Sequence, residues 1–260
     1  MDPKLATASD TVIELRDVTY RVNGSSARPL VSGISFAVAR GETLVLLGRS
    51  GSGKTTLLRL INRMLVPSSG EILVNGGPAS QLDPIRLRRG IGYVIQEGGL
   101  FPHFTVAQNI SLLPTLENWP EPDRSRRLRE MMQLVGLDFT SFEKRFPREL
   151  SGGQRQRVGV ARALAADPPI LLMDEPFGAL DPVTRAELQK EFHALAARLR
   201  KTILFVTHDL REALLLGTRI ALLHEGRLVA LTTPAEFLRL DQPEARAFAA
   251  SFDLTPGAPQ

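Results

Sequence analysis

Residues 43–55 read TLVLLGRSGSGKT. The first five of them form a continuous apolar run that meets a glycine-rich turn, which is typical of a buried strand in a covered sheet. After the turn, apolar residues recur at helical spacing until Pro67 stops the pattern, namely Leu57, Leu58, Ile61, Met64 and Leu65. The stretch therefore predicts a strand, a tight turn and a helix, the unit from which α/β folds are built.

The turn matches the phosphate-binding pattern G-x-x-x-x-G-K-[ST]. Its glycines let successive backbone N–H groups point at phosphate oxygens, and the start of the helix adds its positive end. Lys54 can neutralise phosphate charge, and the Thr55 hydroxyl suits Mg²⁺. A plain glycine-rich turn is the alternative, but the strand before and the helix after favour nucleotide binding. The predicted nucleotide-binding residues are Gly48, Arg49, Ser50, Gly51, Ser52, Gly53, Lys54, Thr55 and Thr56.

Further apolar runs extend the α/β pattern. Buried strands are predicted at residues 170–173 and 202–206, with a helix between them. Asp181-Pro182 starts that helix well, because an acid at the N-cap and a proline at the first helical position are both favoured. Strand, helix, strand in this order predicts a parallel sheet. Residues 12–15 and 34–38 predict an antiparallel piece, and residues 219–223 with 227–230 predict a hairpin.

The middle of the chain has a different pattern. From about Gln96 to Ala165 it is mainly helical, with an apolar stripe that Gly136 can end, formed by Leu128, Met131, Met132 and Val135. We therefore expect an α/β nucleotide-binding core over residues 1–95 and 166–240 and an inserted helical subdomain over residues 96–165. Residues 241–260 are expected to be a short C-terminal extension whose end, 255–260, is disordered.

Two adjacent acids, Asp174 and Glu175, directly follow the strand predicted at residues 170–173. Neighbouring strand residues point to opposite faces, so the two acids are expected to have different roles. Asp174 can hold Mg²⁺, and Glu175 can polarise the water that attacks the terminal phosphate. A solvated acidic turn before Pro176 is the alternative.

Composition narrows the class of protein. The chain has 260 residues, 43% of them hydrophobic, and a net charge of +4. Its densest basic runs, at residues 86–89 and 124–129, lack interleaved aromatic residues, which favours solvated helix faces over a nucleic-acid surface. The absence of cysteine excludes disulfides and thiolate metal sites. The lack of cysteine also fits a reducing cytoplasm. The sequence shows no apolar run long enough to span a bilayer, and its start lacks the pattern of a secretory signal.

Residues 150–154, LSGGQ, are similar to the signature sequence of ABC ATPases. Ser151 and Gln154 also fit a capping box at a helix start, and both interpretations are compatible. The resemblance implies a P-loop NTPase (RecA-like) core with an antiparallel β piece and an inserted helical subdomain. It also implies that Ser151, Gly152, Gly153 and Gln154 meet the terminal phosphate of ATP held by a partner ATPase subunit, so that the active unit is a dimer, with a homodimer expected.

The resemblance covers roughly residues 12–240 and implies further roles. Gln96 stands where the family has a glutamine that contacts Mg²⁺ and the attacking water. Residues 178–181, ending in Asp181, resemble the D-loop, and His208 resembles the switch histidine that contacts the terminal phosphate. The family usually stacks adenine on an early aromatic residue. Tyr20 lies near that position, but the expected spacing falls on Val22, so both remain candidates.

Finer resemblance suggests a cargo. Residues 92–103 and 159–185 are similar to ATPases of osmoprotectant importers for glycine betaine, choline, carnitine or proline. This implies membrane permease subunits as partners, with residues 101–106 in the docking groove, and a substrate-binding protein as an indirect partner, at the cytoplasmic face of the inner membrane. Ionic-strength-sensing CBS domains, frequent in that subfamily, are expected to be absent. An exporter or lipid-trafficking ATPase is the alternative, and a soluble ABC protein acting on nucleic acid or ribosomes is a further one.

Overall fold

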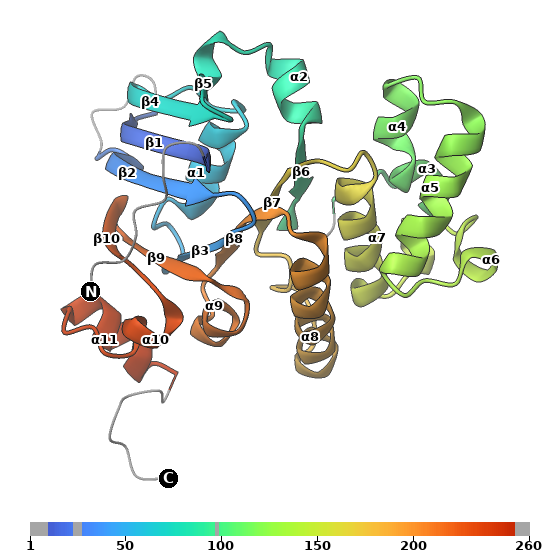
Figure 1. The fold of residues 1–260 in the computed structure, drawn as a ribbon. Helices are drawn as coiled ribbons and strands as arrows, with labels where there is room; N and C mark the ends of the chain where they lie inside the picture. Colours follow the sequence, from blue (N-terminus) through green and yellow to red (C-terminus); the bar gives the residue numbers. More distant parts are fainter. Residues whose placement is uncertain (1–9, 23–27, 97–98, 253–260) are drawn as a thin grey trace. The chain divides into compact units, whose positions relative to one another are not determined.

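The computed structural model describes residues 10–22, 28–96 and 99–252. They form two compact units, one from the described parts of Met1–Leu87 and Arg200–Gln260, the other from those of Arg88–Leu199 (Figure 1). The predicted disorder at residues 255–260 lies outside the described residues.

The first unit contains a four-stranded antiparallel sheet, visible in blue and teal in Figure 1. Its order is β2-β1-β4-β5, which confirms the predicted antiparallel piece and adds two strands that were not predicted. Alternate β1 residues such as Ile13 and Leu15 are buried, whereas Asp17 adopts a φ of 50° where the pairing slips. The strands are β1 (Thr11–Tyr20), β2 (Val31–Ala39), β4 (Ser69–Val74) and β5 (Gly77–Pro78).

Four further strands of this unit are neighbours in the order β10-β9-β3-β8. The central β3 is buried along its whole length and runs parallel to both β8 and β9. The pair β9–β10 is an antiparallel hairpin that turns at Glu225 and Gly226, both with positive φ. These features confirm the predicted parallel strands and hairpin. The bounds are β3 (Thr43–Leu47), β8 (Thr202–Thr207), β9 (Arg219–His224) and β10 (Arg227–Thr232).

The helix after the glycine-rich turn is shorter than predicted. It runs from Lys54 to Ile61 as α1, and at its end the backbone N–H groups of Asn62 and Arg63 donate to the carbonyl oxygens of Leu58 and Leu60, respectively. Arg63 then takes a φ of 56°, so Met64 lies beyond the helix and is 53% exposed. The prediction was too long because apolar residues continue at helical spacing beyond Ile61, whereas the left-handed backbone at Arg63 stops the helix. The other helices of this unit are α9 (Leu210–Leu216), α10 (Pro234–Phe237) and α11 (Pro243–Ala250), and α2 (Pro84–Arg89) crosses the boundary between the units.

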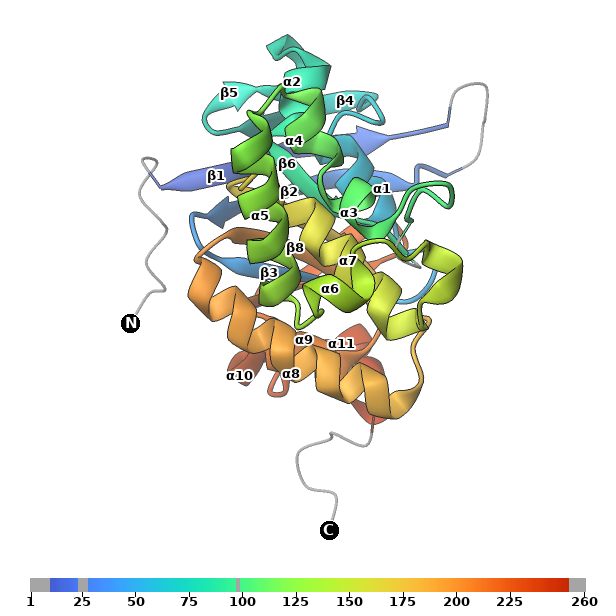
Figure 2. The same ribbon diagram turned by 90° about the vertical axis from the view of Figure 1, so that its right-hand side faces the viewer.

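The second unit is mainly helical, as Figure 2 shows for α3 to α8. Its two strands, β6 (Ile91–Val94) and β7 (Ile170–Asp174), are parallel. Helix α5 packs against α7 and ends at Leu134; Val135 is its C-cap, and Gly136 follows with a φ of 67°, in agreement with its predicted role as a helix terminator. The helices are α3 (Val106–Ile110), α4 (Leu112–Leu116), α5 (Glu121–Leu134), α6 (Phe139–Phe142), α7 (Gly152–Leu164) and α8 (Pro182–Leu199).

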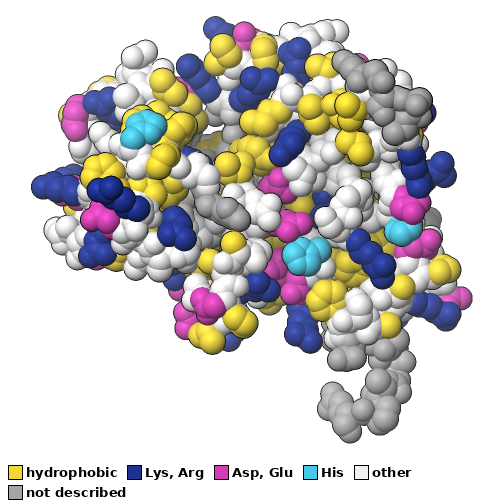
Figure 3. Space-filling view, turned by 180° about the vertical axis from the view of Figure 1, so that it is seen from behind, with side chains coloured by type: hydrophobic (Ala, Val, Ile, Leu, Met, Phe, Trp, Pro, Cys, Tyr) yellow, Lys and Arg dark blue, Asp and Glu magenta, His cyan; other side chains and the backbone are white. Residues whose placement is uncertain are grey.

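On the face shown in Figure 3, Lys and Arg side chains are interspersed with Asp and Glu. In the basic run on α5, Arg126 pairs with Asp123 at 2.7 Å, and Arg127 donates to the carbonyl oxygens of Leu164 and Ala165. These arginines therefore interact within their own unit.

Among the described residues, no helix is both long and apolar enough to span a bilayer.

Candidate functional site

The loop from Gly48 to Thr55 follows β3 directly and depends on its glycines. Gly51 and Gly53 have φ angles of 78° and 100°, which favour glycine. A Cβ at Gly53 would lie 2.6 Å from the Leu30 carbonyl oxygen, and one at Gly48 would lie 2.4 Å from that of Leu223. The loop therefore tolerates no larger residue at these two positions.

Lys54 lies within this loop. Its side chain is only 4% exposed, and Nζ donates to the carbonyl oxygens of Gly48 at 2.8 Å and Arg49 at 2.9 Å. It is also the first residue of α1, whose first turn contains no acid. A buried ammonium group and the positive end of a helix converge on one glycine-rich loop, which suits the phosphates of a nucleotide.

The sheet places His208 beside this loop. Leu47 of β3 and Thr207 of β8 are register partners in parallel strands, so Gly48 and His208 both leave the sheet at the same edge. His208 is exposed.

The two adenine candidates also belong to this unit. Tyr20 ends β1, is half-buried and pairs with Val31, whose Cγ2 would lie 3.4 Å from a Cβ on Gly53. Val22 is 50% exposed. Tyr20 therefore belongs to a strand pair that borders the glycine-rich loop, and the choice between the two remains open.

In the second unit, β6 and β7 end at one edge and bring Gln96 and the two acids to it. Val94 and Met173 are register partners, Asp174 is the last residue of β7, and Gln96 is exposed. Asp174 is 7% exposed, and the Tyr93 hydroxyl donates to its Oδ2 at 3.5 Å. Tyr93 was not predicted as a neighbour, because only strand pairing brings it there.

Glu175 corrects the argument from strand alternation. It lies one residue beyond β7, is half-buried and has a φ of 43°. A left-handed backbone at a residue other than glycine costs of order 1–3 kcal/mol, and such strain clusters at functional sites. The chain turns at Glu175, so the alternation of side chains along a strand does not apply to this residue.

The structure confirms the capping box at the start of α7. The Gln154 backbone N–H donates to Ser151 Oγ at 3.2 Å, and the Ser151 backbone N–H donates to Gln154 Oε1 at 2.9 Å. Ser151 is exposed, so the hydroxyl and the helix start are available to a ligand.

The signature glycines also allow the predicted D-loop to approach. A Cβ at Gly153 would lie 2.7 Å from Thr184 Cγ2, and one at Gly152 would lie 3.3 Å from Leu180. Asp181 caps α8, accepting from the Thr184 backbone N–H at 3.1 Å, and the hydrogen bonds from Thr184 hold its pKa below the usual value. This packing role of the two glycines was not apparent from the sequence.

The predicted Mg²⁺ ligands are divided between the units: Thr55 belongs to the first, Gln96 and Asp174 to the second. Within the described residues, no group of three or more His, Asp or Glu side chains is placed to hold a metal ion. Mg²⁺ at nucleotide sites usually binds one or two protein side chains plus phosphates and water. A buried carboxylate such as Asp174 suits that kind of site.

Comparisons with known proteins agree with this set of features. Residues 31–178 match the family described as ABC transporter. The chain is 54% identical over 228 residues to a glycine betaine/carnitine/choline transport ATP-binding protein of Bacillus subtilis (strain 168), covering 88% of this chain and 59% of that protein. It is 48% identical over 212 residues to a glycine betaine uptake system ATP-binding protein of Escherichia coli (strain K12), covering 82% and 68%.

A solved structure with a similar fold is a dimeric ATP-binding cassette in a post-hydrolysis state bound to ADP and Pi. Its TM-score is 0.76 at 32% identity, covering 85% of this chain and 98% of that one. Among curated relatives that transport or import osmoprotectants, including the two above, this chain spans 57 to 68% of their length. Sequence and fold lead to one conclusion: the chain belongs to the ABC transporter family.

Proposed function

We propose that this chain is the ATP-binding and ATP-hydrolysing subunit of an ABC importer. The loop from Gly48 to Thr55 supports this most directly, because its positive-φ glycines and the buried Lys54 suit the binding of phosphates. In this proposal residues 48–56 bind the phosphates, and Tyr20 or Val22 contacts the base. Thr55, Gln96 and Asp174 hold Mg²⁺, which supplies charge stabilisation during phosphoryl transfer.

The catalytic residues proposed are Glu175, His208 and Gln96. Glu175 accepts a proton from the attacking water, and Gln96 orients that water. His208 donates a hydrogen bond to the terminal phosphate. Positioning and charge stabilisation carry the reaction without a covalent intermediate.

The active unit in this proposal is a dimer with two ATP molecules. Each ATP lies between residues 48–55 of one copy and residues 151–154 of the other, with Asp181 close to the second group. The exposed, capped start of α7 supports this, because it offers a serine hydroxyl and helix N–H groups to a ligand. Gly153 lets this start of α7 lie close to Thr184 of α8.

The proposed cargo is an osmoprotectant such as glycine betaine, choline, carnitine or proline. The printed names of the relatives support uptake of such compounds, and one of them names import. They lend no support to an exporter, to lipid trafficking or to action on nucleic acid or ribosomes.

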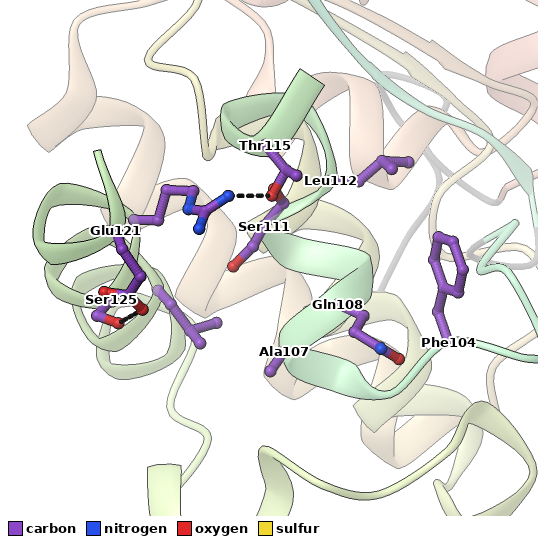
Figure 4. Close-up of a pocket in the computed structure, with 10 residues that line it drawn as sticks. Phe104, Ala107, Gln108, Ser111, Leu112, Thr115, Glu121 and Ser125 are labelled. Atoms are coloured by element: carbon purple, nitrogen blue, oxygen red, sulfur yellow. Dashed lines mark hydrogen bonds between the residues drawn. The ribbon is translucent and has the colours of Figure 1, made fainter. Parts of the chain in front are cut away.

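The membrane permease subunits are proposed to dock on a pocket in the second unit (Figure 4). It measures about 360 Å³ and lies between α3–α4 and α5. Phe104 and Leu112 give it an apolar lining, while Glu121 and Arg124 supply charge. An amphipathic helix with a basic or acidic end fits such a lining. Such docking would hold the chain at the cytoplasmic face of the inner membrane, with a substrate-binding protein as an indirect partner.

Calorimetry of ATP with Mg²⁺ tests the nucleotide site. Lys54→Ala is expected to weaken binding about 100-fold, because it removes charge-assisted bonds to the phosphates. Lys190→Ala, which removes an exposed lysine of α8, is the matched control and should bind normally. Equal affinity of the two variants would refute the phosphate site.

Uptake tests the cargo. The chain, produced together with the membrane subunits of its transporter, is expected to support ATP-dependent accumulation of radiolabelled glycine betaine or choline in cells that lack their own uptake systems. If the cells accumulate none of glycine betaine, choline, carnitine and proline, while the purified chain hydrolyses ATP normally, the osmoprotectant assignment is rejected and the ATPase assignment is kept.

A further inference from the structure

The turn that carries His208 is held by a buried hydrogen-bond network. It begins at Thr207, the last residue of β8, which is 2% exposed and pairs in register with Leu47 beside the glycine-rich loop. It ends at Asp209, the N-cap of α9. His208 is the one residue between them.

The Thr207 hydroxyl connects both ends of this turn. It donates to Glu212 Oε2 at 2.5 Å and accepts from the Asp209 backbone N–H at 2.9 Å. Donation to the carboxylate orients the hydroxyl so that a lone pair faces Asp209. The second bond closes a small ring around the backbone of His208.

Glu212 anchors this ring to the helix. It lies in the first turn of α9 and is 4% exposed. Burial of a carboxylate is costly unless hydrogen bonds compensate it, so the bond from Thr207 helps to stabilise Glu212 in its buried position. The Asp209 carboxylate accepts from the Arg211 backbone N–H at 2.7 Å and fixes the same turn from its other side. Strand end and helix start are thus joined across His208.

We propose that Thr207 and Glu212 are positioning residues that hold His208 toward the terminal phosphate. The inference rests on the proposed function, in which His208 touches that phosphate. Thr207 and Glu212 themselves are buried and act through the backbone of His208. Loss of the network would leave nucleotide binding by Lys54 intact and would lower turnover.

Variants of the purified full chain test this with ATP hydrolysis at saturating ATP and Mg²⁺. Thr207→Val keeps the side-chain shape but removes the hydroxyl, and it is expected to lower kcat about tenfold with KM changed less than about twofold. Thr207→Ser restores the hydroxyl and should keep kcat within about twofold of the unaltered chain. Glu212→Gln keeps an acceptor without the charge, so about a threefold loss is expected.

Thr202→Val is the matched control. Thr202 is also on β8, is also 2% exposed and also accepts a backbone N–H, that of Gly41 at 3.0 Å. This variant should lose stability but keep kcat. A similar loss of kcat in the Thr202 and Thr207 variants would show that general destabilisation explains both, and would overturn the proposal.

A double-mutant cycle with His208→Ala, followed by single-turnover hydrolysis, separates positioning from packing. If Thr207 and Glu212 act through the imidazole, Thr207→Val and Glu212→Gln should each cost less than about twofold once His208 is removed. An equal loss in both backgrounds would overturn the proposal.

Two outcomes distinguish this proposal from the proposed function. Normal turnover of His208→Ala would remove the assigned role of His208 and, with it, this inference. Loss of turnover in His208→Ala, combined with normal kcat in Thr207→Val, would overturn the positioning role only.

Discussion

Replacing Asn109 by alanine is expected to destabilise the segment that leads into the proposed docking pocket. Asn109 is fully buried on α3. Its Nδ2 lies within hydrogen-bond distance of the carbonyl oxygens of Phe101 at 3.2 Å, Phe104 at 3.1 Å and Thr105 at 3.0 Å. Its Oδ1 accepts from the Phe101 backbone N–H at 2.9 Å. One side chain therefore holds the whole of residues 101–105.

The magnitude follows from these bonds. An amide nitrogen has two protons, so its three contacts amount to about two full bonds. With the bond that Oδ1 accepts, about three bonds are lost at roughly 1 kcal/mol each, and the Phe101 N–H is left without its partner. The free energy of unfolding is expected to fall by about 2–4 kcal/mol.

Urea unfolding of the purified chain measures this loss, and hydrogen exchange at the Phe101 amide shows its location. Gln133→Ala removes an exposed side-chain amide from α5 and serves as the control, with an expected change below about 0.5 kcal/mol. A change below about 1 kcal/mol in Asn109→Ala, with the Phe101 amide still protected, would refute the reasoning from hydrogen bonds.

Two further predictions concern the site. Glu175→Gln should bind ATP with unchanged affinity but hydrolyse it at least about 100-fold more slowly, because the amide cannot accept the water's proton; near-normal hydrolysis would remove Glu175 as the base. Asp181→Asn keeps the cap but removes the charge. Because hydrogen bonds from Thr184 lower the folded-state pKa of Asp181, its charged form adds stability above its usual pKa of about 3.9, and this is lost as pH falls through the lowered value. The stability difference between the unaltered chain and Asp181→Asn should therefore be constant near pH 7 and shrink below about pH 4; a difference that does not change with pH would contradict the charged cap.

Local sequence patterns predicted the elements well where short-range physics decides them. The apolar run before Gly48, the acid and proline at Asp181 and the capping box at Ser151 act within a few residues, and each element has the predicted type. The predicted end of α1 was wrong, because apolar residues continue at helical spacing past Ile61 although the left-handed backbone at Arg63 stops the helix.

Part of the candidate site depends on contacts between distant parts of the chain. Strand register brings His208 beside the loop at Gly48, and Tyr93 to Asp174. Periodicity along the sequence carries no information on such pairs, since each depends on which strands become neighbours.

The sequence by itself determined the glycine-rich loop, the paired acids and the signature, because their chemistry lies in consecutive residues. Only the tertiary structure decided three other features: that Glu175 takes a left-handed backbone, that Gly153 admits Thr184, and that a buried threonine–glutamate pair holds the turn at His208. The physical reason is the same for the last two. Close packing and buried hydrogen bonds join residues that only the folded chain brings together.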